Sequence, residues 1–309
     1  MNNFKKLGLT ALAGSLVATT AFAGEMSVNG NASVTAKNNS GTDGGKSFTM
    51  GNQLTFSGGG ELDNGLNVAL SFVLDHGDNV ASGFDSHSIS IGSDTIGTFT
   101  FAGDGTGNAQ SALDTTAAGD IWDNTFASYT APTNADANKV LTWTLPTVMD
   151  GLGVTTSYNM SSAAKEGTIG YALTYTGVEG LSVSYGFGEV GGNTAGTTGA
   201  EVTTMKASFA FGPVTAAMSI NDYDITGASN EEQSSYSISY SVSDELSISY
   251  GSETHETTGQ TTDEEFDQIS VSYTTGGLTA SVSQTNADNV NGATNTEQQK
   301  WNVGLSFAF

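Results

Sequence analysis

Alternation of apolar and polar residues is the feature that most restricts how this chain can fold. Between residues 26 and 37, even positions such as Val28, Val34 and Ala36 are apolar or small, whereas the odd positions are polar. A period of two is typical of a β-strand whose two faces meet different surroundings. The same pattern marks segments at 28–36, 48–56, 66–74, 89–91, 99–101, 141–145, 152–160, 169–175, 181–187, 205–211, 214–220, 236–242, 246–250, 269–273, 278–282 and 301–309. The sequence therefore predicts an all-β protein of sixteen strands.

The connections between these segments alternate in length. Short turns fall at 63–65, 93–94, 150–151, 179–180, 212–213, 244–245 and 276–277, and longer polar loops at 38–46, 77–83, 104–138, 161–166, 188–200, 224–232, 254–264 and 286–297. Seven short turns and eight long loops place both chain ends on the short-turn side. This arrangement is typical of an outer-membrane barrel with short periplasmic turns and long external loops.

The polar face of the predicted strands is small and almost uncharged, as in the run Ser235, Ser237, Ser239. A soluble β-sandwich, the alternative, would direct many charges from this face toward water. We therefore interpret the apolar face as lipid-facing and the polar face as lining a lumen. Each strand offers about nine to eleven residues, enough to cross the hydrocarbon layer when tilted. At sixteen strands, side chains alone cannot fill the interior, so the sequence predicts a water-filled antiparallel transmembrane β-barrel.

The first 23 residues have the features of a secretory signal peptide. Lys5 and Lys6 precede an apolar stretch too short to span a bilayer, and Ala21 and Ala23 form a small-x-small cleavage site. We expect the barrel domain to comprise residues 24–309. No run of 18 apolar residues follows, so no transmembrane helix is expected.

The charge balance excludes nucleic acid as a partner. All eight basic residues are lysines, against 32 acids, and phosphate binding requires clusters of Lys and Arg. Cysteine is absent, which leaves no disulfide or thiolate ligand. The spacing of His76, His87 and His255 fits no zinc pattern, and no nucleophile motif of an enzyme is present. We expect neither a metal site shared by these histidines nor enzymatic activity.

The loop 104–138 is the one long interruption of the alternation, and loops of this length are usually functional or disordered. Its segment from Asp120 to Phe126 mixes large apolar residues with carboxylates, which favours an ordered loop. We predict that this loop folds into the lumen as a constriction. Four of its carboxylates are the candidate constriction residues: Asp104, Asp114, Asp120 and Asp123. Rings of acidic side chains are typical of cation-preferring pores.

Two interpretations of the Gly-rich passage around Asp104 remain open. Carboxylate, amide and backbone oxygens suit a weakly bound Ca²⁺. A Gly-rich bend that lets the loop turn inward explains the same residues without an ion.

Three passages resemble known sequences: the strand-to-loop segment from Phe99 to Gly107, the strand from Val140 to Thr144, and the terminal segment from Trp301 to Phe309. They resemble the general porins of Gram-negative bacteria, most closely the type of purple non-sulfur and related bacteria. The resemblance implies an outer-membrane homotrimer of sixteen-stranded barrels that passes ions and small hydrophilic solutes by diffusion. It also implies a third external loop folded inward, opposite basic residues of the wall.

The chain departs from that family in having no Arg for its wall. Strand parity instead directs three lysines toward the lumen: Lys37, Lys206 and Lys300. In the last strand, Trp301, Phe307 and Phe309 form an aromatic face similar to the one by which such barrels are recognised for insertion, and this strand must pair with residues 26–37 to close the ring. An alternative function is a surface barrel that acts in adhesion or envelope structure.

Overall fold

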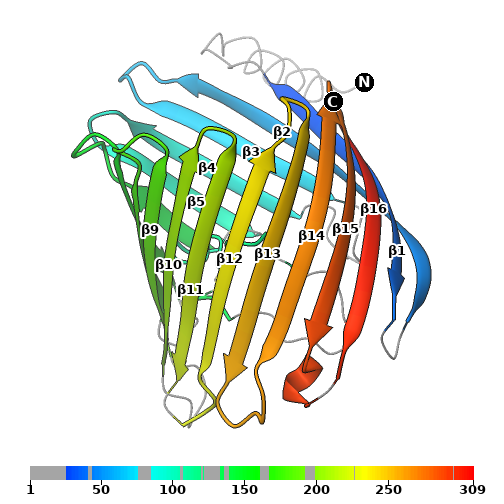
Figure 1. Ribbon diagram of the computed structural model, residues 1–309. Coiled ribbons are helices and arrows are strands. Elements are labelled where there is room, and N and C mark those ends of the chain that lie inside the picture. Colours follow the sequence, from blue (N-terminus) through cyan, green and yellow to red (C-terminus); the bar gives the residue numbers. More distant parts are fainter. Residues whose placement is uncertain are drawn as a thin grey trace, which may run out of the picture.

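The structure is a computed structural model that describes residues 26–40, 44–75, 85–104, 107–119, 121, 133–135, 139–160, 167–191, 199–225, 227–294 and 296–309. The predicted signal peptide lies outside this part of the chain. Sixteen antiparallel strands form a closed barrel in which each strand pairs with its sequence neighbours and the first pairs with the last (Figure 1).

The strands are β1 (Ser27–Asn39), β2 (Gly45–Glu61), β3 (Asn67–Asp75), β4 (Ser86–Ser93), β5 (Gly97–Asp104), β6 (Val140–Thr144), β7 (Leu152–Asn159), β8 (Thr168–Tyr175), β9 (Leu181–Val190), β10 (Ala200–Phe211), β11 (Val214–Ile225), β12 (Glu231–Ser241), β13 (Leu246–Thr257), β14 (Glu264–Thr275), β15 (Leu278–Asp288) and β16 (Gln298–Ala308). A 3-10 turn, η2 (Val290–Gly292), precedes β16. The predicted number of strands is confirmed. The predicted short turns fall at connections between consecutive strands, where glycines such as Gly65 (φ +80°) and Gly276 (φ +56°) adopt turn conformations.

Strand lengths differ more than the alternation predicts, from five residues in β6 to 17 in β2. Leu145 still donates to the carbonyl of Val154 at 2.9 Å. Pro146 follows directly, and because proline has no N–H it cannot continue the ladder. The strand that resumes after the long loop is therefore the shortest.

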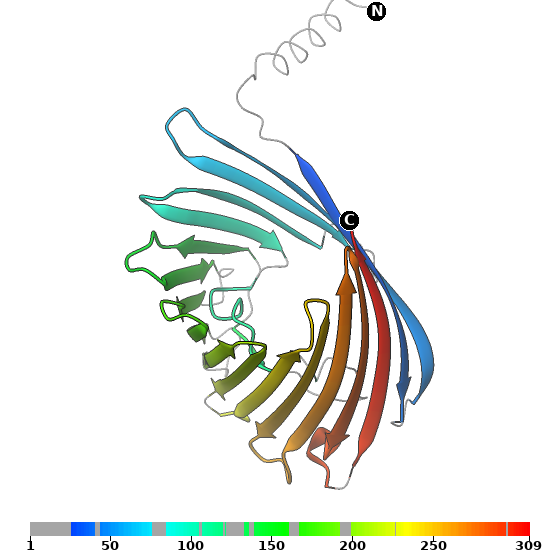
Figure 2. The same ribbon diagram turned by 45° about the horizontal axis from the view of Figure 1, so that its top comes forward.

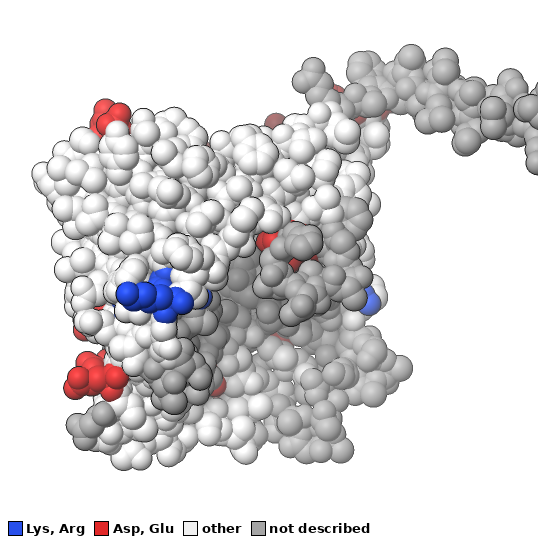
Figure 3. All heavy atoms as spheres, turned by 90° about the vertical axis from the view of Figure 1, so that its right-hand side faces the viewer, with Lys and Arg blue, Asp and Glu red and all other residues white. Residues whose placement is uncertain are grey.

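Outward-facing apolar side chains form a belt around the barrel, which we call the outer belt. Ile89, Tyr171 and Ile269 are among its exposed members. Figure 3 shows one side of the molecule, where small groups of charged residues are separated by wide uncharged areas. Within the described residues, no helix has the length and hydropathy needed to cross a membrane. The outer belt thus confirms the predicted orientation of the apolar faces, which point outward and not into a core.

The external ends of β12–β14 extend beyond the outer belt. The Tyr250 hydroxyl donates to the outward carboxylate of Asp267 at 2.6 Å, at the external edge of the belt. Beyond that edge, toward the long loops, the outward positions include Thr254, Glu256 and Glu265. Charged side chains are costly within hydrocarbon, so these strand ends lie outside the membrane-spanning part of the barrel.

The barrel closes between β1 and β16, with Cα pairs from Asn31–Ala308 to Asn39–Lys300. This confirms the predicted pairing of the last strand with residues 26–37. Gly30 and Phe309 exchange backbone hydrogen bonds of 2.8 and 2.9 Å. A Cβ at Gly30 would lie 2.5 Å from the Phe309 ring, so the terminal aromatic residue itself requires glycine there. The start of β1 and the end of the chain after β16 therefore meet at the short-turn side of the barrel.

Candidate constriction in the barrel lumen

Part of the long loop between β5 and β6 lies inside the barrel, against its inner wall (Figure 2). We call the described residues 107–119 and 121 the outgoing limb and residues 133–135 the return limb. The side chains that these limbs contact belong to strand positions of the opposite parity to the outer belt, and thus face the lumen. The lumen wall and the two limbs together form the candidate site.

A turn around Asn108 starts the outgoing limb. The Asn108 Oδ1 accepts hydrogen bonds from the backbone N–H groups of Gln110 and Ser111, at 2.9 and 3.0 Å, and the Asn108 side chain is fully buried. This is the local turn that an Asn side chain stabilises by replacing a backbone acceptor. Ala109 N–H donates to Ser157 Oγ of β7 at 2.7 Å. The loop is therefore fixed to the wall as soon as it enters the lumen.

Gln110 connects the two limbs to each other and to β10. Its Nε2 donates to Thr204 Oγ1 at 2.8 Å and to Asn134 Oδ1 at 3.2 Å, while its Oε1 accepts from Ala135 N–H at 2.8 Å. Gln110 is fully buried. A buried amide whose donors and acceptor are all paired makes the relative position of the limbs specific.

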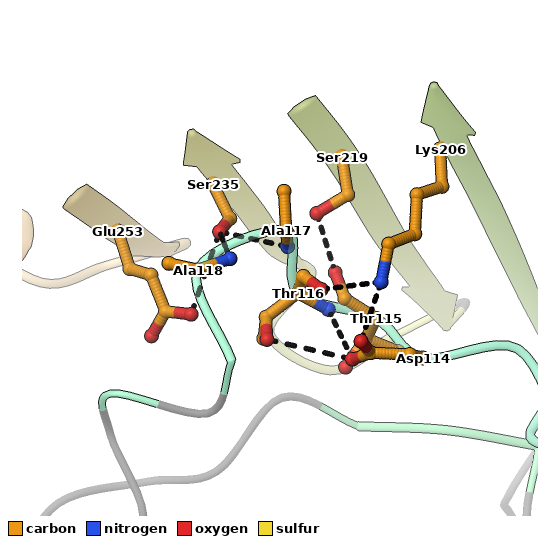
Figure 4. A network of polar contacts seen from close by, with 9 residues as sticks. All are labelled: Asp114, Thr115, Thr116, Ala117, Ala118, Lys206, Ser219, Ser235 and Glu253. Atoms are coloured by element: carbon orange, nitrogen blue, oxygen red, sulfur yellow. Dashed lines mark hydrogen bonds and ion pairs between the residues drawn. The ribbon is translucent and has the colours of Figure 1, made fainter. Parts of the chain in front are cut away.

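The outgoing limb then follows one row of wall residues around the barrel. The strand registers align Lys206, Ser219, Ser235, Glu253 and Phe266 at the same height on β10–β14. We call these five residues the wall row. Figure 4 shows the limb running along the first four of them.

Lys206 is the member of the wall row that meets a loop carboxylate. Its Nζ forms an ion pair with Asp114 and donates to the Thr116 carbonyl at 2.7 Å. Asp114 Oδ1 also accepts from Thr116 N–H at 3.0 Å. Because the Asp114 side chain keeps half of its surface exposed, this carboxylate both anchors the limb and faces the lumen.

Two serines of the wall row hold the middle of the outgoing limb. Ser219 Oγ donates to the Thr115 carbonyl at 2.8 Å. Ser235 Oγ accepts from the N–H groups of Ala117 and Ala118, at 3.0 and 2.9 Å. These bonds satisfy loop backbone groups that would otherwise be buried without partners. The serines are themselves almost fully buried.

The outgoing limb ends in a small apolar cluster on β14, β15 and η2. Ile121 packs with Phe266, Ala287 and Val290, all at most 2% exposed, and Ala118 packs against them. Phe266 is thus a large apolar side chain at a lumen-facing position. Phe266 departs from the polar character of the other inward positions, and the loop shields its ring from water.

Glycines at lumen-facing strand positions let the limbs approach the wall closely. We call the following four the glycine seat: Gly170, Gly186, Gly188 and Gly251. A Cβ on Gly251 would lie 2.7 Å from Ala118 Cβ, one on Gly186 would lie 2.7 Å from Leu113 Cδ1, and one on Gly188 would overlap Ala135. Any larger residue at these positions would displace the loop.

The return limb is anchored next to three ionisable side chains, which we call the charge cluster: Glu231, His255 and Glu264. Thr133 Oγ1 donates to Glu231 Oε2 at 2.7 Å. His255 Nε2 lies 3.7 Å from the same Oε2, and His255 Nδ1 lies 3.7 Å from Glu264 Oε2. His255 and Glu264 are almost completely buried.

The charge cluster lies at the external ends of β12–β14, beyond the outer belt and outside the membrane-spanning part of the barrel. Burial alone would lower the pKa of His255, but the neighbouring carboxylates of Glu231 and Glu264 outweigh it and raise the pKa to about 9. Burial also opposes the charged form of Glu231, yet hydrogen bonds from His255 and Thr133 leave its pKa lowered. The arrangement is therefore an imidazolium between two carboxylates.

The structure brings together some of the residues predicted from the sequence. Asp114 and Lys206 are in contact, and the register places Lys37 and Lys300 on lumen-facing positions of β1 and β16. Asp104 ends β5, where its backbone pairs with that of His87, and its side chain is outside the described part. Asp120 and Asp123 also lie outside the described residues.

Sequence reasoning missed the charge cluster and the glycine seat. Two signals were available: Gly186 and Gly188 interrupt the polar parity of β9, and four ionisable residues occupy lumen parity on β12–β14, namely Glu231, Glu253, His255 and Glu264. From the sequence alone, His255 is considered only as a possible metal ligand. In the described ranges, no group of three or more His, Asp or Glu residues is arranged to hold a metal ion.

Comparisons with known proteins agree with the barrel fold. A family model described as Gram-negative porin matches residues 8–309. Comparison with curated proteins gives no match. Three solved structures are similar in fold. An anion-selective porin from Comamonas acidovorans is 14% identical (TM-score 0.68; 92% of this chain and 99% of that one covered). OmpT of Vibrio cholerae in its trimer form is 12% identical (0.67; 93% and 100%). A variant of the Rh. blastica porin is 14% identical (0.66; 92% and 100%).

Proposed function

The chain belongs to the Gram-negative porin family of outer-membrane channels, and we propose that its inward loop is the constriction of a water-filled, cation-preferring diffusion pore. The observation that supports this most directly is the path of the outgoing limb, which contacts lumen-facing residues from Ser157 on β7 to Phe266 on β14. A loop held across eight strands reduces the open cross-section that a sixteen-stranded barrel leaves. Ions and small hydrophilic solutes are the permeants that such an opening admits.

The sign of the preference comes from counting the charges at the constriction. The charge of Lys206 is matched by Asp114. The loop contributes three further candidate carboxylates, Asp104, Asp120 and Asp123, against Lys37 and Lys300 on the wall. Within about 8 Å, the screening length at physiological salt, wall charges act on every permeating ion. The similar Comamonas porin is named as anion-selective, so a barrel of this fold does not by itself determine the sign of the preference.

Reversal potentials in planar bilayers under a KCl gradient test this proposal. The wild-type channel should prefer cations, and the variant with Asp104, Asp114, Asp120 and Asp123 all changed to Asn should lose most of that preference. A control variant neutralises four outward-facing acids, Glu201, Glu232, Glu256 and Glu265, by change to Gln. Anion preference in the wild type, or an equal loss in the control, would show that the loop is not the filter.

We further propose a homotrimer of the type formed by the porins of purple non-sulfur bacteria. The Vibrio cholerae neighbour is described in a trimer form, and a Rh. blastica porin shares the fold. Asn52 and His87 supply polar groups at outward strand positions, which fit a neighbouring barrel better than lipid. Native mass spectrometry in mild detergent should give a mass three times that of the processed chain. A monomer as the sole species would contradict this assignment.

A further inference from the structure

A second row of wall residues lies next to the wall row, on the side toward the long loops. Its side chains are more deeply buried. The strand registers align Thr204, Asn221, Gln233, His255 and Glu264 at one height on β10–β14. None of the five is more than 2% exposed. We call them the buried row. These five buried polar side chains lie at one height, and Thr204 and Asn221 among them contact the two limbs directly.

The neutral end of the buried row holds the loop through hydrogen bonds. Gln110 donates to Thr204 Oγ1, which donates to Asn221 Oδ1 at 2.6 Å, and Asn221 Nδ2 donates to the Thr133 carbonyl at 3.1 Å. Thr133 therefore accepts a hydrogen bond from Asn221 through its carbonyl and donates one to Glu231 through its hydroxyl. The return limb sits between the two.

The charged end of the buried row depends on His255. Glu264 is fully buried, and its ion-pair partner is His255 Nδ1. The other ring nitrogen faces the Glu231 oxygen that accepts from Thr133. Both ring nitrogens donate only when the imidazole is protonated. A neutral ring would leave carboxylate charge uncompensated inside the protein, which is strongly destabilising.

We propose that His255 is a positioning residue that, as an imidazolium between Glu231 and Glu264, keeps the return limb on the lumen wall and the pore narrow. This rests on the proposed role of the loop as the constriction. The described ionisable groups that face this region are Tyr223 from β11, Glu231 from β12, Glu253 from β13 and Glu264 from β14. None of these four side chains can carry a positive charge, so His255 supplies the positive charge among them.

The sign of the pH dependence follows from the charged form of His255. Its pKa in the folded protein is about 9, above the ordinary value of 6.5. Its stabilisation of the return limb is thus fully present below about pH 6.5, where the free residue is also protonated, and is lost as pH rises through 9. We expect the return limb to detach from the wall in alkaline solution.

A single engineered cysteine reports the position of the return limb, since the chain has no native cysteine. Ala135→Cys places a thiol at a fully buried position of that limb. Ala112→Cys, exposed on the outgoing limb, gives the reference rate and corrects for the faster reaction of all thiols at high pH. The probe is a membrane-impermeant maleimide applied to the channel reconstituted in liposomes.

Charge compensation distinguishes positioning by His255 from simple packing. At pH 7, His255→Gln should raise the labelling of Cys at position 135, relative to the reference, by at least about tenfold, the factor expected for losing about 1.4 kcal/mol of anchoring. Adding Glu264→Gln should return the rate close to wild type, because it removes the uncompensated charge without refilling the space. With His255 intact, relative labelling should rise between pH 7 and 10; in the double variant this rise should be absent.

Equal labelling in wild type and His255→Gln, or a double variant as reactive as the single one, would overturn the role of His255. These rates are independent of ion selectivity. If the reversal potentials described above show that the loop is not the filter while the labelling pattern holds, the constriction proposal fails and the positioning role stands. If the reversal potentials show that the loop is the filter but the labelling pattern is absent, the constriction proposal stands and the positioning role of His255 fails.

Discussion

The two halves of the lumen wall differ in what their inward positions carry. The half covered by the loop, β7–β15, has the glycine seat, the wall row and the charge cluster. The open half, centred on β1–β4, carries mainly small polar side chains, and Ser27, Ser57, Ser71 and Ser88 share one height there. The inward side chains of the open half need only to contact water. The covered half must match a second surface, so its residues are specific to their positions.

The largest effect is expected at the seam, where β1 and β16 close the ring. Trp301→Ser combined with Phe309→Ser removes two large apolar side chains, each worth about 1.5–3 kcal/mol when moved out of water, from the strand that closes the ring. We expect most of the protein to fail to assemble, measured by heat-modifiable mobility in gels. Normal assembly would show that the aromatic face of β16 is dispensable for closure.

The next effect is expected from filling the glycine seat. Gly188→Val places side-chain atoms where Ala135 packs, and overpacking of this kind costs about 1–3 kcal/mol. Displacement of the loop relieves the overlap, so single-channel conductance should increase while the barrel still assembles. Gly51→Val, at a lumen-facing position of the open half, is the matched control and should leave the pore no wider. A wider pore in both variants would remove the distinction between the two halves.

A smaller effect is expected from the ion pair between loop and wall. Lys206→Met frees the half-exposed carboxylate of Asp114 and should shift the reversal potential further toward cations. The loss of stability should be about 0.2–1 kcal/mol, as for other partly exposed ion pairs. In the background of Asp114→Asn, the same lysine change should move the selectivity much less. Equal shifts in both backgrounds would mean that Lys206 acts on ions directly.

The smallest effect is expected on the lumen wall between the loop and the short-turn side of the barrel, where the side chains face water. Ser249 and Ser270 share a hydrogen bond of 2.7 Å, yet both can exchange it for water. Ser249→Ala should change stability by less than about 0.5 kcal/mol and leave conductance unaltered. A measurable change in conductance would show that the hydroxyl groups of this region contact the permeants.

How much the sequence predicts also differs between the two halves. Alternation predicts the strand number, the turn positions and the seam, because each follows from local parity and turn residues. The contact between Lys206 and Asp114 joins residues 92 apart, and parity identifies Lys206 as lumen-facing without identifying its partner. His255 was missed for a physical reason. Its role comes from registers between β12, β13 and β14, which align it with Glu231 and Glu264, and register is not visible in any single strand.

The location of the seam also has a consequence for the order of folding. The described loop residues contact β7–β15, which are contiguous in sequence, whereas β1 and β16 meet outside that stretch. An open, curved sheet of the middle strands can therefore receive the loop from its concave side before the first and last strands join. A ring that had already closed would have to admit the same loop through its mouth. Closure as the last step thus spares the chain a threading problem.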